Sequence, residues 1–317
     1  MGLAQAVEQY GYDSLGRLIA VDRSSQTNTA YRYDAAGNRT TVTTLNQMEA
    51  VWQAESLPHV IGYGIPGGWE ASAGLGSGFM TYGPYTPATP TGLNIASWRI
   101  KVDSHTYPDT GDVVALDIWD ATAGVSLGSA GFDRRAFTAS DTYQYLDVPF
   151  ALVAASSGHQ LEFRTWSTGR ATVGVDALGY RRAGSAWSGT DSSIYHVVGR
   201  AAADGWAASV TDPAGHMTYG PYAAAPVGAR TAIWRMRIND NTSPDTSPIV
   251  TIDIWDASAG QSLGTRTLKR QDWKQASQFQ LFEIPFVLDP ARAGHALEYR
   301  TYFHRNANVV LNWVGYR

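Results

Sequence analysis

The chain has 317 residues, a formal net charge of −4, 44% apolar residues, 12% aromatic residues and 16% charged residues. The low charge content argues against coiled coils and charged disordered tails, and the slightly acidic balance argues against nucleic acid or an anionic membrane as a partner. The absence of cysteine excludes disulfide frameworks, thiol nucleophiles and cysteine-ligated zinc.

The first residues lack the features of a secretion signal. Residues 1–12 contain no basic region followed by an apolar core, and no later stretch approaches the roughly 20 apolar residues that a membrane helix needs. We therefore expect no signal peptide and no membrane insertion, in a chain that is a piece of a longer protein.

A short repeat opens the chain. The motif Tyr-Asp-x-x-Gly begins at Tyr12 and again, 21 residues later, at Tyr33. This pattern resembles the YD repeats of Rhs-type proteins, whose hairpins spiral into a large hollow β shell. The resemblance implies that residues 1–48 are a remnant of such an array, with the remainder of a longer YD-repeat chain as a partner. Because two isolated hairpins are barely stable, we expect this segment to be partly mobile or to pack on the next domain.

Two longer segments then repeat at an offset of 136 to 137 residues. Met-Thr-Tyr-Gly-Pro-Tyr begins at Met80 and Met217, and Asp-Ile-Trp-Asp begins at Asp117 and Asp253. Such self-similarity fixes the domain count before any fold is assigned. It predicts two modules joined by a linker rich in Gly, Ser and Ala, namely residues 49–182, 183–190 and 191–317.

Apolar residues alternate within each module, as in strands with one wet face. In residues 114–119, Leu116 and Ile118 share one face, so Asp117 and Trp119 share the other. Turns rich in Gly, Pro, Asp and Asn separate these stretches, and no helical period is sustained. We predict an all-β chain, in which two tandem β-sandwich domains of jelly-roll form follow a short β-hairpin segment.

The order of motifs in both modules resembles carbohydrate-binding-module-like jelly rolls, which are attached to bacterial glycoside hydrolases and Rhs proteins. The shared order is His-x-x-Gly, Gly-Trp-x-Ala-Ser, Tyr-Gly-Pro-Tyr, Asp-Ile-Trp-Asp and Glu-Phe/Tyr-Arg. The resemblance implies binding of a polysaccharide or glycoconjugate without catalysis, in a secreted or cell-surface protein. In several such families Ca²⁺ joins the first and last strands, and Glu55 and Asp176 would hold it in module 1. Ser192 and Asn312 replace them in module 2.

Sugars present apolar C–H faces and a fringe of hydroxyls, so a site for them needs exposed flat rings beside side chains with several hydrogen-bonding groups. Acidic, Arg and aromatic residues recur together on one predicted outer strand face of each module, and a glycine turn before Trp69 and Trp206 is expected to lift these two rings outward in loops. The candidate ligand-binding residues are Trp69, Tyr85, Arg99, Asp117, Trp119, Glu162, Arg164 and Trp166 in module 1, and Trp206, Tyr222, Arg235, Asp253, Trp255, Glu298, Arg300 and Tyr302 in module 2.

A structural interpretation competes at each position. The acids and arginines would form cross-strand ion pairs on a solvated sheet, the Gly-Trp pairs would pack on the core, and the tyrosines would anchor strand entries. Trp98 and Trp234, in phase with apolar neighbours, are expected in the core. The loops at 103–109 and 239–245 gather oxygen ligands suited to a cation, but they are also ordinary Asx-rich turns.

Catalytic motifs are weak. The sequence has no His-Glu-x-x-His and no phosphate-binding glycine loop, and an arginine setting for Asp117 and Glu162 suits hydrogen-bond acceptors, not a general acid. We therefore predict a non-catalytic glycan-binding protein that is not an enzyme and requires no cofactor, the calcium ion being only what the resemblance implies for module 1. The alternatives are a structural or adhesive spacer without a glycan ligand and, less favoured, a polysaccharide hydrolase or lyase.

Overall fold

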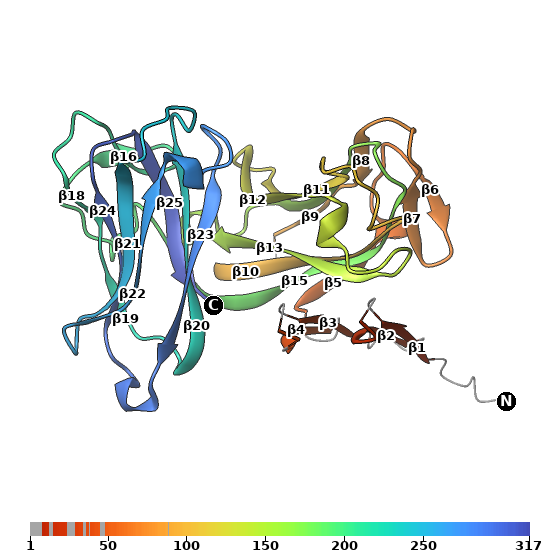
Figure 1. Cartoon of the computed structure of the whole chain (residues 1–317), viewed down its shortest axis with the longest axis horizontal. Coiled ribbons are helices and arrows are strands. Elements are labelled where there is room, and N and C mark those ends of the chain that lie inside the picture. Colours follow the sequence, from red (N-terminus) through yellow and green to blue (C-terminus); the bar gives the residue numbers. More distant parts are fainter. Residues whose placement is uncertain are drawn as a thin grey trace. The chain divides into compact units, whose positions relative to one another are not determined.

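A computed structural model of the chain describes residues 8–12, 15–23, 29–33, 36–37, 39–44, 48–87 and 89–317. The chain divides into two compact units, Met1–Arg182 and Ala183–Arg317. β-Strands dominate both of them (Figure 1). Across the described residues, no helix is long and apolar enough to cross a lipid bilayer.

The N-terminal segment forms a four-stranded antiparallel sheet. Its strands, in spatial as well as chain order, are β1 (Glu8–Tyr12), β2 (Leu18–Arg23), β3 (Thr29–Tyr33) and β4 (Arg39–Thr44). The Tyr33 hydroxyl donates to the Leu18 carbonyl at 2.9 Å, and the Arg17 guanidinium lies 4.8 Å from the Tyr33 ring centroid. The second predicted repeat therefore packs on the first. The motif positions 13–14 and 34–35 lie outside the described residues.

Module 1 is a sandwich of two sheets. The β10 sheet consists of β5 (Ala50–Gln53), β6 (Tyr63–Ile65), β7 (Gly68–Ala71), β10 (Gly92–Val102), β13 (Gln144–Leu152) and β15 (Val173–Ser188). The β11 sheet consists of β12 (Val125–Phe132), β11 (Val114–Asp120), β14 (Leu161–Ser167), β8 (Gly78–Thr81) and β9 (Pro84–Thr86), the last two both pairing with β14. Short 3₁₀ turns lie at η2 (Ala54–Ser56), η3 (Arg134–Ala136) and η4 (Ala154–Ser156). The chain passes from sheet to sheet between β10 and β15, as in a jelly roll.

Module 2 repeats this architecture. The β20 sheet consists of β16 (Arg200–Ala202), β17 (Gly205–Ala208), β25 (Val309–Tyr316), β20 (Gly228–Ile238), β23 (Gln280–Leu288) and the end of β15. The β21 sheet consists of β18 (Gly215–Thr218), β19 (Pro221–Ala223), β24 (Leu297–Phe303), β21 (Pro248–Asp256) and β22 (Gln261–Lys269). The 3₁₀ turns are η5 (Arg270–Asp272) and η6 (Pro290–Arg292). The predicted fold class is confirmed.

Alternation along the strands fills the core between the sheets. Leu116 and Ile118 of β11 are fully buried, whereas Trp119 beside them is half-buried on the outer face. Trp98 and Trp234 are fully buried, which confirms their predicted core positions. Burying an aliphatic side chain such as Leu116 contributes about 2 kcal/mol of stability, so the period-two pattern determines which face of each strand remains outside.

The segment predicted as a linker, residues 183–190, is mostly strand. Residues 185–188 of β15 pair antiparallel with residues 313–316 of β25, and Trp187 stacks on Tyr299 with 5.9 Å between ring centroids. The linker prediction is therefore wrong for this part. Small residues suggested a flexible joint, but Gly184 is small because a Cβ there would collide with the Tyr316 carbonyl oxygen of the adjacent strand.

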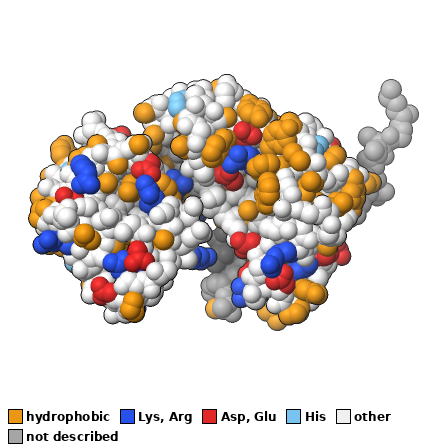
Figure 2. Space-filling model, turned by 90° about the horizontal axis from the view of Figure 1, so that it is seen from above, with side chains coloured by type: hydrophobic (Ala, Val, Ile, Leu, Met, Phe, Trp, Pro, Cys, Tyr) orange, Lys and Arg blue, Asp and Glu red, His pale blue; other side chains and the backbone are white. Residues whose placement is uncertain are grey.

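Charges on the surface are mixed. Figure 2 shows basic and acidic side chains lying close together, with hydrophobic side chains between them. Ion pairs of this kind include Arg181 with Asp147, at 3.0 Å, and Arg237 with Asp204, at 2.7 Å. The mixed surface fits the small net charge of −4.

Candidate functional site

The outer face of the β11 sheet carries an arginine–aspartate pair. Asp117 of β11 lies directly opposite Arg164 of β14, and alternation turns both side chains away from the core. Arg164 Nε donates to Asp117 Oδ2 at 3.0 Å, Nη2 donates to the same oxygen, and the Ser126 hydroxyl donates to Oδ1 at 2.8 Å. These bonds hold the guanidinium in one orientation.

Aromatic rings surround this guanidinium. Its central carbon lies 4.4 Å from the ring centroid of Trp119 and 5.3 Å from that of Phe79. Phe79 in turn meets Trp166 edge to face, with 4.8 Å between centroids. All three rings are half-buried. Cation–π contact is worth about 0.5–2 kcal/mol, so the outer face is a rigid row of flat groups.

Glu162 and Tyr85 extend this face towards β9. Glu162 is only 7% exposed, whereas Tyr85 is 46% exposed. Burial and the negative charge of Glu162 raise the pKa of the Tyr85 hydroxyl. Tyr85 has a φ of 64°, a left-handed conformation that costs a residue with a side chain about 1–3 kcal/mol. The exposed ring of Tyr85 beside Glu162 is therefore a candidate contact for a ligand.

Module 2 has the same centre, which consists of a paired arginine and aspartate with a tryptophan, a glutamate and a tyrosine beside them. Arg300 Nε donates to Asp253 Oδ1 at 3.0 Å, and the guanidinium carbon lies 4.3 Å from the Trp255 ring centroid. Glu298 is 7% exposed, and Tyr222, with a φ of 61°, is 44% exposed. Burial raises the pKa of Glu298, although Arg300 opposes the shift. The duplicated sequence therefore produces a duplicated constellation.

The two residues at the margin of the centre, Phe79 and Trp166 in module 1, are different in module 2. His216 and Tyr302 occupy the positions of Phe79 and Trp166, and their rings meet edge to face at 5.4 Å. Burial and the Arg300 charge lower the pKa of His216. Its buried Nδ1 has no hydrogen-bond partner among the described residues. Module 1 is thus apolar where module 2 offers an imidazole and a phenol.

Module 2 also has a tyrosine cluster, which consists of Tyr195, Tyr219 and Tyr222. The Tyr195 ring stacks on Tyr219 with centroids 5.5 Å apart and meets the edge of Tyr222 at 6.0 Å. Tyr195 is 49% exposed. Pro58 stands at the matching position of module 1, so the cluster is particular to module 2.

Arg99 and Arg235 do not join these faces. Both were predicted to lie beside the acid, arginine and Trp residues, but β10 and β20 belong to the opposite sheets. Arg99 Nη1 donates to Asp176 at 2.6 Å and lies over the Tyr143 ring, 4.7 Å from its centroid. Arg235 lies 4.5 Å from the Phe279 centroid. The prediction of one shared face is therefore wrong, because alternation fixes a residue's face but not its sheet.

Trp69 and Trp206 also lie outside the outer faces of the β11 and β21 sheets. Each ring stacks on a histidine, Trp69 on His59 at 3.5 Å and Trp206 on His196 at 3.4 Å, and each indole N–H donates to a backbone carbonyl at 2.8 Å. Both rings pack against the module cores. The prediction that a glycine lifts these rings outward is wrong. A Cβ at Gly68 would instead collide with the backbone of β15.

Calcium binding gains no support from side-chain placement. No three carboxylate or imidazole groups converge as metal ligands in the part of the chain that the structure describes. Asp176 is engaged by Arg99, and Glu55 lies exposed in η2. In this arrangement Asp176 and Glu55 do not form a cage for a cation, and calcium binding stays a prediction.

The two loops with oxygen ligands are turns. Asp103, Asp109, Asp240 and Asp245 each accept a backbone N–H one or two residues further along, at 2.7–2.9 Å. Asp103 also binds the buried Arg134. The carboxylates are therefore used to shape and brace the loops, as the turn interpretation expects.

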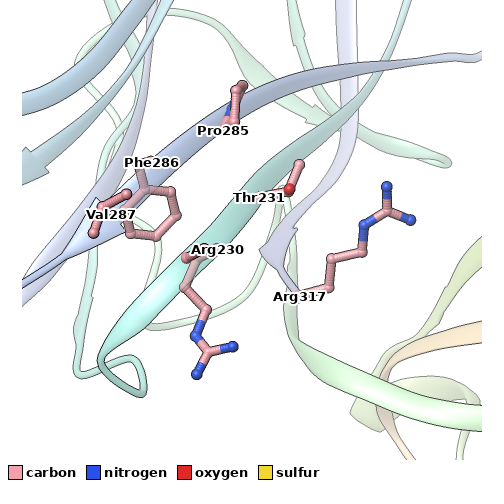
Figure 3. A pocket seen from close by; sticks show the side chains of 7 residues that line it. Arg230, Thr231, Pro285, Phe286, Val287 and Arg317 are labelled. Carbon is pink, nitrogen blue, oxygen red and sulfur yellow. The ribbon is translucent and has the colours of Figure 1, made fainter. Parts of the chain in front are cut away.

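A shallow hollow of about 330 Å³ lies on module 2, at one end of β20 (Figure 3). Arg230 and Arg317 point along its rim, and Phe286 and Val287 line one side. Arg230 donates to two backbone carbonyls at 2.9 Å each, and Arg317 pairs with Glu283 at 3.1 Å. The hollow contains none of the predicted site residues.

Sequence reasoning missed three residues of the faces. Phe79 and His216 were detectable, because each precedes a methionine that faces the core and must therefore point outward. Tyr195 lies in a loop before β16, where no periodic signal marks it. The other predicted residues of the two faces, Asp117, Trp119, Glu162, Arg164, Trp166 and Tyr85 with their counterparts, are brought together on the outer faces of the β11 and β21 sheets.

The chain resembles known proteins in part. Residues 12–46 match the family model described as RHS Repeat. No curated protein matches the chain. Among solved structures it is similar to the N-terminal CBM22-1-CBM22-2 tandem domain from Paenibacillus barcinonensis Xyn10C, at 10% identity and a TM-score of 0.29, over 98% of this chain and 96% of that chain. It is also similar to a Paenibacillus xanthan lyase, at 13% identity and a TM-score of 0.29, over 88% of this chain and 27% of that chain.

Proposed function

We propose that the two modules bind glycans without catalysis through the outer faces of the β11 and β21 sheets, as parts of a longer YD-repeat protein that is secreted or held at the cell surface. The observation that carries this proposal is the duplicated centre, in which an arginine is clamped by an aspartate, stacked on a tryptophan and flanked by a buried glutamate and an exposed tyrosine.

The centre has the groups that a sugar requires. Nη1 of Arg164 and Nη1 of Arg300 make no hydrogen bond to any described residue, so both remain available to ligand hydroxyls. The half-buried indoles of Trp119 and Trp255 offer flat apolar surface to C–H groups. Two copies on one chain raise avidity, because the second contact becomes intramolecular.

One specific observation favours the spacer alternative. Arg164 with Asp117 and Arg300 with Asp253 are cross-strand ion pairs, as that interpretation expects. Such pairs on a sheet contribute at most about 1 kcal/mol when exposed. They account for the charged groups of the two faces but not for the exposed rings of Tyr85 and Tyr222 beside them.

The test is a binding screen on the intact chain against plant, algal and bacterial polysaccharides, with tryptophan fluorescence as readout and each positive repeated with EDTA. A change in fluorescence with one polysaccharide class, reduced in the variant that combines Trp119→Ala with Trp255→Ala, supports the proposal. Val287→Ala serves as the control, because Val287 is 68% exposed on the β20 sheet. A blank across all classes from folded protein favours the spacer.

A further inference from the structure

The glutamates beside the two centres are buried without an ion pair. Glu162 and Glu298 are each 7% exposed, and within the described residues neither forms a salt bridge. The aspartates next to them, by contrast, are each clamped by an arginine. A buried carboxylate without an ion pair is costly to ionise, so a cationic group of a ligand would be stabilised beside it.

The balance of charge at the module 2 face is negative. Arg300 supplies one positive charge, whereas Asp253 and Glu298 supply two negative charges, and Asp253 is already the partner of the arginine. The excess negative charge therefore resides on Glu298. A ligand with a carboxylate or sulfate would be repelled there, and a ligand with a positive group would be attracted.

The tyrosine cluster stands next to this carboxylate. Burial and the nearby negative charge of Glu298 raise the pKa of the Tyr222 hydroxyl, and the ring of Tyr222 is 44% exposed at that edge. Tyr195 stacks on Tyr219 and meets Tyr222 edge to face. Electron-rich ring faces attract cations, and a group of rings beside a carboxylate is the usual arrangement for an ammonium ligand.

We infer that the tyrosine cluster and Glu298 of module 2 select saccharides that carry a protonated amine, such as an oligomer of glucosamine, over their N-acetylated and acidic counterparts. This inference rests on the proposed glycan binding and specifies its ligand. The ammonium group sits against Glu298 and the tyrosine rings, and the sugar ring and its hydroxyls use Trp255 and Arg300 Nη1.

Module 1 is the internal comparison. It keeps Glu162 and Tyr85 but has Pro58 in place of Tyr195, so it lacks one ring of the cluster. The preference for the amine is therefore weaker in module 1. Tyr195→Ala lowers the preference of module 2 towards that level, and alanine retains the backbone N–H that Tyr195 donates to the Tyr219 carbonyl at 2.8 Å.

The experiment measures the affinity of the intact chain for three oligosaccharides of equal length, made of glucosamine, N-acetylglucosamine and galacturonic acid, at about pH 6, where an amine of this kind is protonated. We expect glucosamine to bind about five- to tenfold more tightly than N-acetylglucosamine, with the ratio falling as salt is added. Glu298→Gln lowers this ratio to within about twofold of one, chiefly by weakening the binding of glucosamine.

The outcomes separate the two proposals. Equal binding of the amine and its acetylated form by the native chain, or tighter binding of galacturonic acid, overturns the amine selectivity and leaves glycan binding intact. Absence of binding to these and to every polysaccharide of the screen overturns both. Since the native chain alone decides between these results, the test does not depend on the folding of a variant, and Tyr195→Ala checks the assignment independently of Glu298→Gln.

Discussion

The outer faces of module 1 and module 2 share a centre and differ at its margin. Each has an arginine clamped by an aspartate over a tryptophan. Around that centre module 1 places Phe79 and Trp166, whereas module 2 places His216 and Tyr302. The duplicated part is the part that holds a rigid flat surface, and the varied part is the part that would meet the rest of a ligand. Two modules built this way can bind different ligands with one mechanism.

The largest expected difference between the modules is in how much unfolding free energy each loses when a buried aspartate common to both is replaced. Asp120 and Asp256 are fully buried, and each binds a histidine, but among the described residues only Asp256 also binds an arginine, Arg292, at 3.0 Å. We expect Asp256→Ala to destabilise unit 2 by about 3 kcal/mol and Asp120→Ala to destabilise unit 1 by about 2 kcal/mol. Denaturant unfolding followed by tryptophan fluorescence measures both. Equal losses of unfolding free energy in the two variants would show that the Arg292 contact adds no stability to module 2.

The same aspartate gives module 2 a dependence on acid. Burial opposes its ionisation, but His295, the Ala259 N–H and Arg292 together hold the pKa of Asp256 below its usual value of 3.8. The stabilisation is therefore complete above the unfolded-state pKa and is lost as the pH falls through the lower folded-state pKa. Thermal melts between about pH 2 and pH 6 should show a steeper acid loss in the native chain than in Asp256→Asn. Parallel curves of Tm against pH for the two proteins would refute a stabilising role for ionised Asp256.

The next effect is on ligand binding at the shared centre. Trp119→Ala and Trp255→Ala should each weaken binding by the module concerned about tenfold, because stacking of an aromatic ring on a sugar is worth about 1–1.5 kcal/mol. Titration calorimetry of the intact chain and of each single variant would resolve the two sites. The conservative change to Phe should restore most of the affinity. A loss that appears in both sites after one substitution would contradict independent centres.

A smaller effect should follow from exchanging the margins. Combining Phe79→His with Trp166→Tyr gives module 1 the side chains of module 2. We expect its affinity for its own ligand to fall about threefold to tenfold and its ligand preference to move towards that of module 2, since the centre is unchanged. A glycan array probed with the native chain and this variant is the measurement. An unchanged profile would show that the margin does not set specificity.

The smallest effect separates function from stability at Glu298. Burial raises the pKa of Glu298, so the unfolded chain holds this proton less tightly than the folded chain, and the charged carboxylate costs stability at neutral pH. Glu298→Gln should raise the Tm at neutral pH, by an amount corresponding to less than about 1 kcal/mol. This gain should vanish below the unfolded-state pKa. A loss of stability at neutral pH would instead assign Glu298 a structural role.

Sequence periodicity predicts local facing well. Leu116 and Ile118 enter the core and Asp117 and Trp119 remain outside, as the alternation indicates. The duplication likewise predicts two modules, because each motif recurs at a nearly constant offset. These inferences hold because the side-chain period of a strand is a local property. The N-terminal YD motif is equally local, and residues 12–46 match the RHS Repeat model.

Contacts and strand pairings between residues distant in the sequence could not be predicted from it. Arg99 shares a period with the site residues but belongs to the opposite sheet, because strand pairing depends on the whole topology. The stacking of Trp69 on His59 joins residues ten apart across a bend, and no spacing rule signals it. The strand at residues 185–188 was concealed because the Gly, Ser and Ala residues around it have the composition of a linker, whereas Gly184 allows a close approach to the backbone of β25. The site was therefore predictable residue by residue, but its assembly was not.

One measurement tests the proposed glycan binding by the two faces most directly, namely oxidative footprinting of the intact chain with and without a saturating saccharide from the screen. We expect protection of Tyr85, Tyr222, Trp119 and Trp255. Tyr63 and Tyr107, which are 42% and 60% exposed on other parts of module 1, should react equally in both samples. Protection of these two tyrosines while the four face residues stay fully reactive would contradict the account.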